Sequence, residues 1–416
     1  MRDFLDSLSL TNFGIIITLL VIVVAGLFLA LRKLRLWWPS GIALIVTAVV
    51  TGIIAVIIEI VWKPFPDALP LRLYIAVGIA VWVVFLVFIG RGVRKLLLGV
   101  LVVSLVGVAA VANSFFKAYP SVGSFFPDRY AVGVDFAEFP SITNPPESYG
   151  NTVGALVTVA LPGEKSGFAA RDAVAYVPPA YWQQPNMNFP VLVLMAGNPG
   201  RPTDWSTSGN MAKAADAFQR ENNGLSPIVV SVDATGSMTG NPVCTDSDVA
   251  KVQTYLTEDV PAGIMKAFRV KPDLRTWTIG GLSYGATCAL QIVTNYPDLY
   301  GSFLDFSGQI EPTMGTRKAT VDKFFGGDES AFVAENPADI LRANESTKTF
   351  SGIEGKFVAG ANDQEAIKAL TELNTLATRA GMTTTFSTLP GGHDFGVWSR
   401  ALEENFAWVA HRGGII

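Results

Sequence analysis

The sequence contains few charged residues, few cysteines and few histidines. Only 16% of its 416 residues are charged and 50% are hydrophobic, whereas soluble chains are about one quarter charged. This balance excludes an intrinsically disordered chain and disfavours a protein that is soluble throughout. The net charge of -4 offers no basic excess for nucleic acid. Two cysteines exclude a disulfide-dense scaffold and a cysteine-rich zinc module, and two histidines limit histidine-dependent chemistry to two residues.

Long apolar runs are concentrated at the start of the chain. They cover residues 13–31, 36–58, 73–90 and 96–116. A helix needs about 20 apolar residues to cross a bilayer, so each run can form a membrane span. Four runs in succession favour spans over the buried helices of a soluble protein. Arg32, Lys33 and Arg35 follow the first run like a stop-transfer signal, which predicts a retained span rather than a cleaved signal peptide.

The basic residues between the runs predict the orientation. The first and third loops carry Arg32, Lys33 and Arg35, and Arg91, Arg94 and Lys95 respectively. The second loop has only Lys63 and Arg72, which Asp67 offsets. The positive-inside rule therefore predicts a multi-pass protein of the cell membrane, with its N terminus and everything after the fourth run outside the cytoplasm.

The one candidate for a charge inside the spans is Glu59, which directly follows the second run at its outer end. Buried charges inside spans would indicate transport or ion conduction. We therefore expect the four spans to act in the lipid bilayer as an anchor or packing platform. A lipid-binding cavity among them is the alternative.

After the spans, the sequence pattern predicts one α/β domain. Residues 117–150 are rich in aromatic residues, proline and glycine and show no helical period, which indicates a linker. Strands are expected at 169–177, 189–195, 228–232, 277–280, 303–306, 356–359 and 383–388, and helices at 208–221, 256–268, 283–295, 364–380 and 395–410. Such alternation predicts a mostly parallel sheet with helices on both faces. The expected domains are thus residues 1–116, 117–150 and 151–416.

The sequence Gly281-Leu282-Ser283-Tyr284-Gly285 lies between a predicted strand and a predicted helix. A nucleophile elbow requires this context, because glycines two residues either side of the serine permit a tight turn that exposes the hydroxyl. The N-terminus of the following helix favours negative charge there. We predict that Ser283 is a nucleophile; a plain turn is the alternative.

A serine hydroxyl needs a base to act as a nucleophile at neutral pH. His393 lies in Gly391-Gly392-His393-Asp394-Phe395, directly after the last predicted strand. Folds with a nucleophile elbow place their catalytic histidine there, after the nucleophile and the acid in chain order. We predict that His393 is the base, although a loop histidine beside a helix start would look similar. His411 lies at the end of the final helix and is expected at the surface.

The acid of a catalytic triad should follow the preceding strand. Asp363 lies just after the strand predicted at 356–359 and is expected to orient the histidine and stabilise its charged form. A helix N-cap is the structural alternative for Asp363. Glu365 and Asp305 are the other candidate acids.

An oxyanion hole needs two backbone N–H donors. We expect one from Tyr284, the residue after the nucleophile, and one from Asn198 in the loop Ala196-Gly197-Asn198-Pro199-Gly200. Pro199 has no N–H to donate. An ordinary tight turn is the alternative for this loop.

Cys244 and Cys288 are the only cysteines. Thiols outside the cytoplasm tend to pair, which predicts a disulfide between Cys244 and Cys288; two buried free cysteines are the alternative. No cluster of His, Asp and Cys has metal-ligand spacing, so we expect neither a metal nor a cofactor.

Five sequence blocks together resemble the esterase D family of α/β hydrolases, which is related to the antigen 85 mycolyltransferases of actinobacteria. They are VPPAY (177–181), MAGNPG (195–200), YLTEDVPAGI (255–264), GGLSYGATCAL (280–290) and GGHDFGVW (391–398). The resemblance implies an α/β-hydrolase fold, Ser283 as nucleophile, His393 as base, and Tyr284 and Asn198 as oxyanion donors. Antigen 85 proteins use a glutamate as the acid, whereas Asp363 matches the general esterase D pattern. Four spans before such a domain resemble actinobacterial membrane-anchored members of the family.

These observations together predict a membrane-anchored serine esterase or acyltransferase outside the cytoplasm. An acyl-enzyme would pass its acyl chain to water or to a sugar hydroxyl, the latter as in mycolyl transfer. Membrane anchoring favours a lipid or cell-envelope ester as substrate. Alternatives from another class are a non-catalytic envelope scaffold and a lipid-handling protein.

Overall fold

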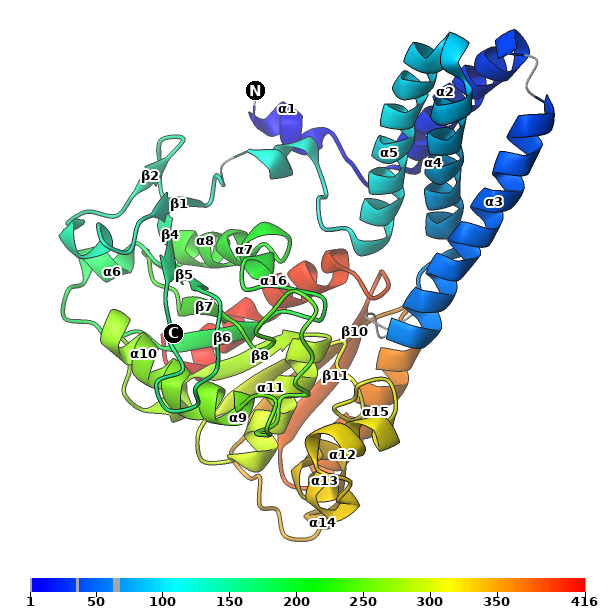
Figure 1. The fold of residues 1–416 in the computed structure, drawn as a ribbon. Coiled ribbons are helices and arrows are strands. Elements are labelled where there is room, and N and C mark those ends of the chain that lie inside the picture. Colours follow the sequence, from blue (N-terminus) through cyan, green and yellow to red (C-terminus); the bar gives the residue numbers. More distant parts are fainter. Residues whose placement is uncertain (1, 35–36, 63–67, 127, 416) are drawn as a thin grey trace. The chain divides into compact units, whose positions relative to one another are not determined.

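A computed structural model describes residues 2–34, 37–62, 68–126 and 128–415 (Figure 1). The chain forms two compact units, residues 1–126 and 127–416. The segment 117–150, for which the sequence predicts a linker, is thereby divided between the two units. Three residues that enter the predicted membrane orientation, Arg35, Lys63 and Asp67, lie outside the described residues.

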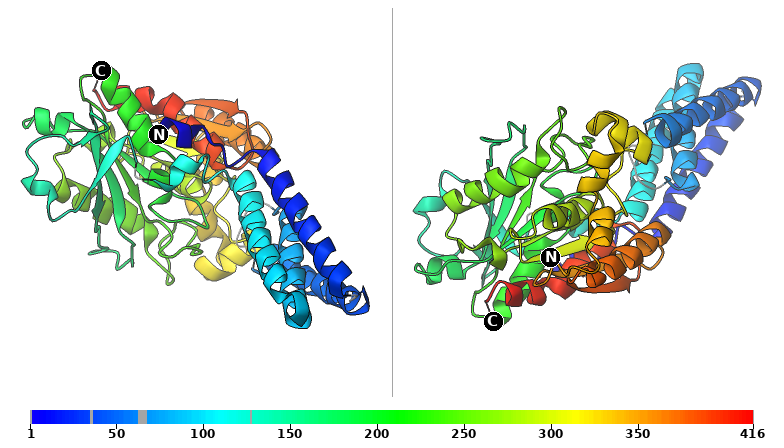
Figure 2. Two further views of the ribbon diagram at one scale, coloured as in Figure 1. Left: turned by 90° about the horizontal axis from the view of Figure 1, so that it is seen from above. Right: turned by 90° about the horizontal axis from the view of Figure 1, so that it is seen from below.

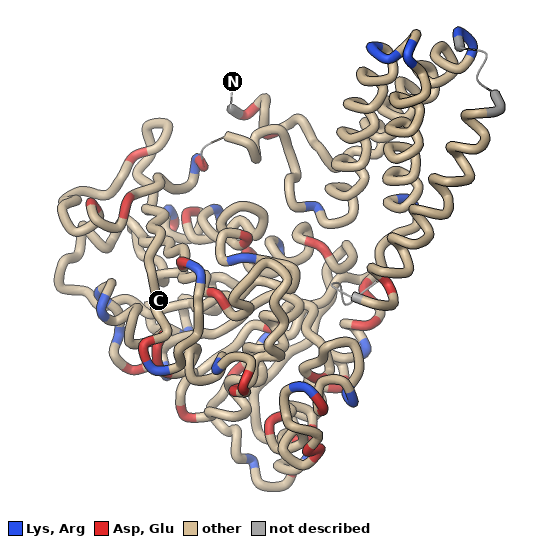
Figure 3. Tube along the Cα trace, viewed as in Figure 1, with Lys and Arg blue, Asp and Glu red and all other residues tan. Residues whose placement is uncertain are grey.

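The first unit is helical in its described residues. Its long helices are α2 (Phe13–Leu34), α3 (Trp37–Val56), α4 (Leu71–Ile89) and α5 (Arg94–Phe116). The shorter ones are α1 (Arg2–Ser7), the π-helix η1 (Ile57–Trp62) and the 3-10 helices η2 (Arg91–Val93) and η3 (Val122–Phe125). Among the described residues of this unit, four helices are long and apolar enough to cross a membrane. Figure 3 shows that charged residues are sparse along them and that Lys and Arg gather at one end.

Helices α2, α4 and α5 pack together through a narrow apolar core, while much of the outer surface of the four long helices is apolar. The core residues are Val23, Leu27, Ala30, Val83, Leu86, Val93, Leu97 and Val100. A Cβ on Gly26 would lie 2.5 Å from a Val100 methyl carbon, so glycine permits α2 and α5 to approach closely. Phe28 and Phe88 point outward and are exposed. Apolar surfaces of this kind suit contact with lipid.

The second unit is built on a nine-stranded sheet with the order β1-β4-β5-β7-β6-β8-β9-β10-β11. The strands are β1 (Ala131–Val134), β4 (Gly154–Val159), β5 (Ala173–Val177), β6 (Val191–Met195), β7 (Ile228–Val232), β8 (Thr278–Leu282), β9 (Ser302–Phe306), β10 (Glu354–Gly360) and β11 (Thr383–Leu389). β5 runs antiparallel to both β4 and β7, and the other neighbours are parallel. A separate antiparallel pair is formed by β2 (Glu147–Ser148) and β3 (Asn151–Thr152).

Helices cover both faces of this sheet (Figure 2). The helices are α6 (Ala180–Gln183), α7 (Asp204–Thr207), α8 (Met211–Glu221), α9 (Val252–Thr254), α10 (Val260–Ala267), α11 (Tyr284–Asn295), α12 (Arg317–Phe324), α13 (Glu329–Glu335), α14 (Pro337–Ala343), α15 (Gln364–Arg379) and α16 (Phe395–Arg412). Short η4 (Phe139–Ser141), η5 (Tyr255–Asp259) and η6 (Leu274–Thr276) complete them.

Alternate side chains of the central strands pack into the hydrophobic cores on the two faces of the sheet, because successive side chains of a strand point in opposite directions. In β6, Val193 enters the core beneath α10, α11 and α15, whereas Leu192 and Leu194 enter the core beneath α8 and α16. Both sets are fully buried. The predicted fold class, a mostly parallel sheet with helices on both faces preceded by four apolar helices, is confirmed.

The structure adds elements that the sequence pattern does not predict. β1 lies within the segment expected to be a linker and pairs in parallel with β4, Ala131 opposite Gly154. Between β9 and β10 the chain forms α12, α13 and α14. Arg317 binds Glu311, Glu329 and Asp339 there, and the rings of Phe325 and Phe332 meet edge to face, so both ion pairs and apolar contacts connect these short helices.

Candidate active site

Ser283 lies between β8 and α11 with φ 52° and ψ -115°. A β carbon on Gly281 would lie 2.5 Å from the carbonyl carbon of Gly285, and one on Gly285 would lie 2.4 Å from the oxygen of Met195. No side chain fits at either position, so both glycines are required by the close approach of β6 to the turn. The positive φ at a non-glycine residue costs about 1–3 kcal/mol and is maintained only where the surroundings enforce it.

Backbone and side-chain hydrogen bonds maintain this turn. The N–H of Ser283 donates to the carbonyl of Phe306 at 2.8 Å, and the Thr287 hydroxyl donates to the carbonyl of Ser283 at 3.1 Å. Thr287 Oγ1 also accepts from the N–H of Gln309 at 2.9 Å. The last residue of β9 therefore binds the N–H of Ser283 directly, and the segment after β9 supports its carbonyl through Thr287.

The structure brings His393 and Asp363 to this serine. His393, in the loop between β11 and α16, has Nε2 2.9 Å from Ser283 Oγ and Nδ1 2.7 Å from Asp363 Oδ2. Asp363 follows β10, and its other oxygen accepts from the N–H of Ala366 at 3.2 Å. One carboxylate thus caps α15 and binds the imidazole.

Burial would raise the pKa of Asp363, but the hydrogen bonds that its carboxylate accepts, above all the one with His393, outweigh the burial. The pKa of Asp363 consequently lies below its ordinary value. An ionised carboxylate in this position holds a proton on Nδ1 and leaves Nε2 free to accept one from the serine.

The other candidate acids and the other histidine occupy different environments. Glu365 is exposed in the first turn of α15, and His411 is exposed in the last turn of α16. Asp305 is fully buried on β9, and its Oδ1 accepts from the N–H of Gly308 at 2.8 Å. Burial raises the pKa of Asp305 to about 7.

The proposed oxyanion donors lie on two segments beside Ser283. A Cβ on Gly197 would lie 3.4 Å from the Cβ of Ser283, so the loop containing Asn198 lies directly against the serine. Tyr284 is the first residue of α11, and the N–H groups of the first helical turn have no partner within the helix. Two segments therefore offer N–H groups near one hydroxyl, as an oxyanion hole requires.

Cys244 and Cys288 form a disulfide with their Cα atoms 5.4 Å apart. Cys288 is one turn beyond Tyr284 on α11. The phenol of Tyr284 donates to the carbonyl of Ala234 at 2.9 Å and accepts from the N–H of Cys244 at 3.1 Å. α11 therefore binds the 234–244 loop through both a covalent bond and a tyrosine.

Sequence reasoning missed two features near these residues. Trp398 lies edge-on to His393 with ring centroids 5.0 Å apart, and its place five residues after the histidine in GGHDFGVW could have indicated this contact. Arg171 and Asp233 form an ion pair of 2.6 Å. No local motif marks that pair, because its members come from different strand ends.

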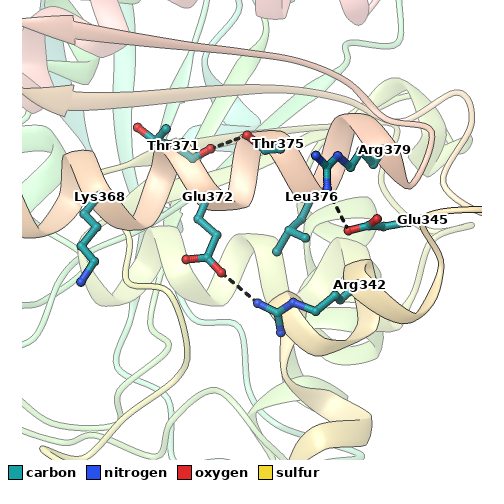
Figure 4. Close-up of a pocket in the computed structure, with 8 residues that line it drawn as sticks. All are labelled: Arg342, Glu345, Lys368, Thr371, Glu372, Thr375, Leu376 and Arg379. Carbon is teal, nitrogen blue, oxygen red and sulfur yellow. Dashed lines mark hydrogen bonds and ion pairs between the residues drawn. The ribbon is translucent and has the colours of Figure 1, made fainter.

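A surface groove of about 650 Å³ lies elsewhere, between α14 and α15 (Figure 4). It is lined by Arg342, Glu345, Lys368, Thr371, Glu372, Thr375, Leu376 and Arg379. Arg342 pairs with Glu372 at 2.9 Å and Arg379 with Glu345 at 3.6 Å, so these charges largely compensate one another. None of the residues near Ser283 lines this groove. Across the described parts of the chain, no group of three or more His, Cys, Asp or Glu side chains could hold a metal ion.

Comparisons with known proteins cover both the whole chain and its second unit. The family model Esterase, described as "Putative esterase", matches residues 170–409, more than half of the chain. An uncharacterized protein of Corynebacterium glutamicum is 52% identical over 417 residues, 99% of this chain and 97% of that protein.

Two solved structures share the fold of the second unit. A ferulic acid esterase matches with a TM-score of 0.50 and 20% identity over 58% of this chain and 92% of that one. FphF, a fluorophosphonate-binding serine hydrolase of Staphylococcus aureus, matches with a TM-score of 0.51 and 14% identity over 62% of this chain and 98% of its own. These likenesses confirm the α/β-hydrolase fold.

Proposed function

The chain belongs to the Esterase family of carboxylic ester hydrolases, and from this premise we propose that Ser283, His393 and Asp363 are its catalytic triad. The observation that carries the proposal is the continuous pair of hydrogen bonds, 2.9 Å from Ser283 Oγ to His393 Nε2 and 2.7 Å from His393 Nδ1 to Asp363 Oδ2. Ser283 Oγ is thus placed to give its proton to His393 Nε2, and Asp363 is placed to orient the imidazole and to stabilise its charged form.

In the proposed reaction, Ser283 Oγ attacks the ester carbonyl while His393 Nε2 accepts its proton. Asp363 stabilises the imidazolium that forms. The N–H groups of Tyr284 and Asn198 bind the oxyanion of the tetrahedral intermediate, and each such donor is typically worth about 3 kcal/mol. His393 then protonates the leaving alcohol, and an acyl-enzyme remains on Ser283.

The second half of the reaction decides between hydrolysis and transfer. His393 Nε2 accepts a proton from the incoming hydroxyl, whose oxygen attacks the acyl carbonyl, and His393 then gives that proton to Ser283 Oγ as the acyl–serine bond breaks. Water gives a free acid, whereas a sugar hydroxyl gives a new ester. We propose that this site can pass its acyl chain either to water or to a sugar hydroxyl.

The proposed substrate is a lipid or cell-envelope ester outside the cytoplasm. Four helices suited to cross a membrane precede the catalytic unit. Tyr119 and Phe125, after the last of these helices, are exposed and stack at 5.2 Å, as suits aromatic residues at a membrane surface. The basic loops of the first unit favour an outer location for the rest of the chain.

Turnover by the full-length protein in detergent tests the proposal. Wild type is expected to cleave p-nitrophenyl butyrate and, faster, a long-chain acyl glycolipid, and Ser283→Ala is expected to lose both activities. Equal rates on the soluble and lipid esters would remove the membrane-substrate part. Added trehalose that captures the acyl chain would identify transfer. A wild type without any turnover would favour the non-catalytic scaffold.

A further inference from the structure

Arg171 and Asp233 form a partly buried ion pair just before β5 and just after β7, two neighbouring strands in the interior of the sheet. Their side chains are 29% and 1% exposed. The guanidinium donates from Nε to Asp233 Oδ2 at 2.8 Å and from Nη2 to Oδ1 at 2.6 Å, a bidentate arrangement. Arg171 lies two residues before β5, and Asp233 directly follows β7. Because the two strands are antiparallel neighbours, the start of β5 lies beside the end of β7.

The same guanidinium reaches the loop that carries Asn198. Arg171 Nη1 donates to the carbonyl of Gly200 at 3.0 Å. The N–H of Gly200 donates to the carbonyl of Met238 at 2.9 Å. The end of this loop is therefore fixed on one side by Arg171 and on the other by the turn after β7.

Asp233 organises that turn. Its Oδ1 accepts from the N–H groups of Thr235 and Gly236 at 3.0 and 3.1 Å. Arg171 Nη2 donates to the hydroxyl of Thr235 at 2.7 Å. Burial would raise the pKa of Asp233, but its bonds to Arg171 and to the turn lower it below the ordinary value, so the carboxylate is ionised at neutral pH.

The turn also holds the residue that would supply the second oxyanion donor. The phenol of Tyr284 donates to the carbonyl of Ala234 at 2.9 Å. Residues 233–238 therefore contact both segments that carry the proposed oxyanion donors. They bind the Asn198 loop through Gly200 and the first turn of α11 through Tyr284. The ion pair supports both contacts, because Arg171 binds Gly200 and Asp233 binds the N–H groups of the turn.

We propose that Arg171 and Asp233 are positioning residues that set the spacing between the two oxyanion donors. This inference rests on the proposed function. The hydrogen bonds of the pair are made with each other, with Gly200 and with the turn at Thr235 and Gly236. It acts through the Gly200 carbonyl on one side and the 233–238 turn on the other.

Such a role has a kinetic signature. Oxyanion donors bind the transition state more strongly than the ground state, so their displacement lowers kcat and leaves KM nearly unchanged. A displacement of about 1 Å can cost about 100-fold in rate. If the ion pair were purely structural, its removal would lower the melting temperature and leave the kcat of the folded enzyme unchanged.

The test uses full-length protein in detergent, p-nitrophenyl butyrate as substrate and a trifluoromethyl ketone as oxyanion analogue. The variants are Arg171→Gln, Arg171→Lys and the charge-free pair Arg171→Met with Asp233→Asn, which leaves no unpaired buried carboxylate. Arg220→Gln is the matched control, because Arg220 binds another buried aspartate, Asp216, at 2.7 Å on α8 without touching the oxyanion loops.

We expect Arg171→Gln and the double variant to lose about 10- to 100-fold in kcat with KM within about twofold of wild type. Affinity for the ketone should fall by a similar factor. Arg171→Lys should recover part of the loss, since lysine keeps the charge but cannot form the fork. Arg220→Gln should keep the wild-type kcat.

Wild-type kcat and ketone affinity in a folded double variant would overturn the inference, and that variant decides the question if Arg171→Gln does not fold. Retained turnover in Ser283→Ala would instead overturn the proposed function itself, and this inference with it.

Discussion

The carboxylate of Asp363 serves two structural purposes, because one oxygen caps α15 and the other binds His393. The helix cap alone would be met equally well by asparagine, which is as good an N-cap as aspartate. The charge matters only for the histidine. This difference separates the catalytic purpose of the residue from its structural one.

Asp363→Asn is therefore expected to fold normally and to lose about 1,000- to 10,000-fold in kcat, since a neutral amide cannot hold the required tautomer or stabilise an imidazolium. Steady-state rates and a melting curve measure the two effects. Glu365→Gln, two residues further along the chain in the first turn of α15, is the control and should retain its activity. A similar loss in both variants would contradict the assignment of the acid.

Asp305 presents the opposite electrostatic case, because it is fully buried and its pKa is raised to about 7. The folded protein binds this proton more tightly than the unfolded chain does. The resulting stabilisation is complete below the ordinary pKa of 3.8 and is lost as pH rises towards about 7. The slope is at most about 1.4 kcal/mol per pH unit.

Asp305→Asn should remove this dependence, since the amide can still accept from Gly308 and cannot ionise. The melting temperature of the variant relative to wild type is expected to rise as pH increases from about 4 to 7. Other titrating groups are common to both proteins and cancel in the difference. A difference in melting temperature between variant and wild type that stays constant across this pH range would show that Asp305 does not titrate as described.

Among the elements, those with a strong local pattern are the ones that the sequence predicts well. The strand at Ile228–Val232 has the expected bounds, and β8, Ser283 and α11 follow in the expected order. Glycine spacing around Ser283 is dictated by contacts within a few ångströms, so it is visible in the sequence. The roles of Ser283, His393, Asp363, Tyr284 and Asn198 stay predictions until they are tested.

Other elements depend on partners far away in the sequence. β1 has four residues and becomes a strand by pairing with β4. α12 has little apolar periodicity to distinguish it, and Arg317 connects it to its neighbours. The contact of Arg171 with Asp233 joins residues 62 positions apart. Such features follow from tertiary packing, which overrides local propensity.

The disulfide connects two elements that frame the site, the 234–244 loop and α11. Cys244 and Cys288 are 44 residues apart, and closing a loop of this length stabilises a fold by about 3–4 kcal/mol in the chain-entropy model. Cys244→Ser with Cys288→Ala is expected to lower the melting temperature, and dithiothreitol should lower that of wild type only. Equal melting of wild type with and without reductant would contradict this stabilisation.

At the scale of the whole molecule, the proposed orientation places the catalytic unit outside the cytoplasm and the basic loops inside. Both native cysteines are consumed by the disulfide, so single cysteines can be introduced as reporters. Thr385 is exposed on β11 and Lys33 is exposed at the end of α2. An impermeant maleimide should label Thr385→Cys in intact cells and Lys33→Cys only after permeabilisation. The reverse pattern would place the catalytic unit in the cytosol.

The central claim is that Ser283 is the nucleophile of this enzyme, and reaction with a fluorophosphonate followed by mass mapping of the adduct tests it most directly. We predict one adduct on the peptide containing Ser283, slower formation in His393→Ala, and none in Ser283→Ala. A wild-type protein that does not react, or an adduct that persists in Ser283→Ala, would contradict the account.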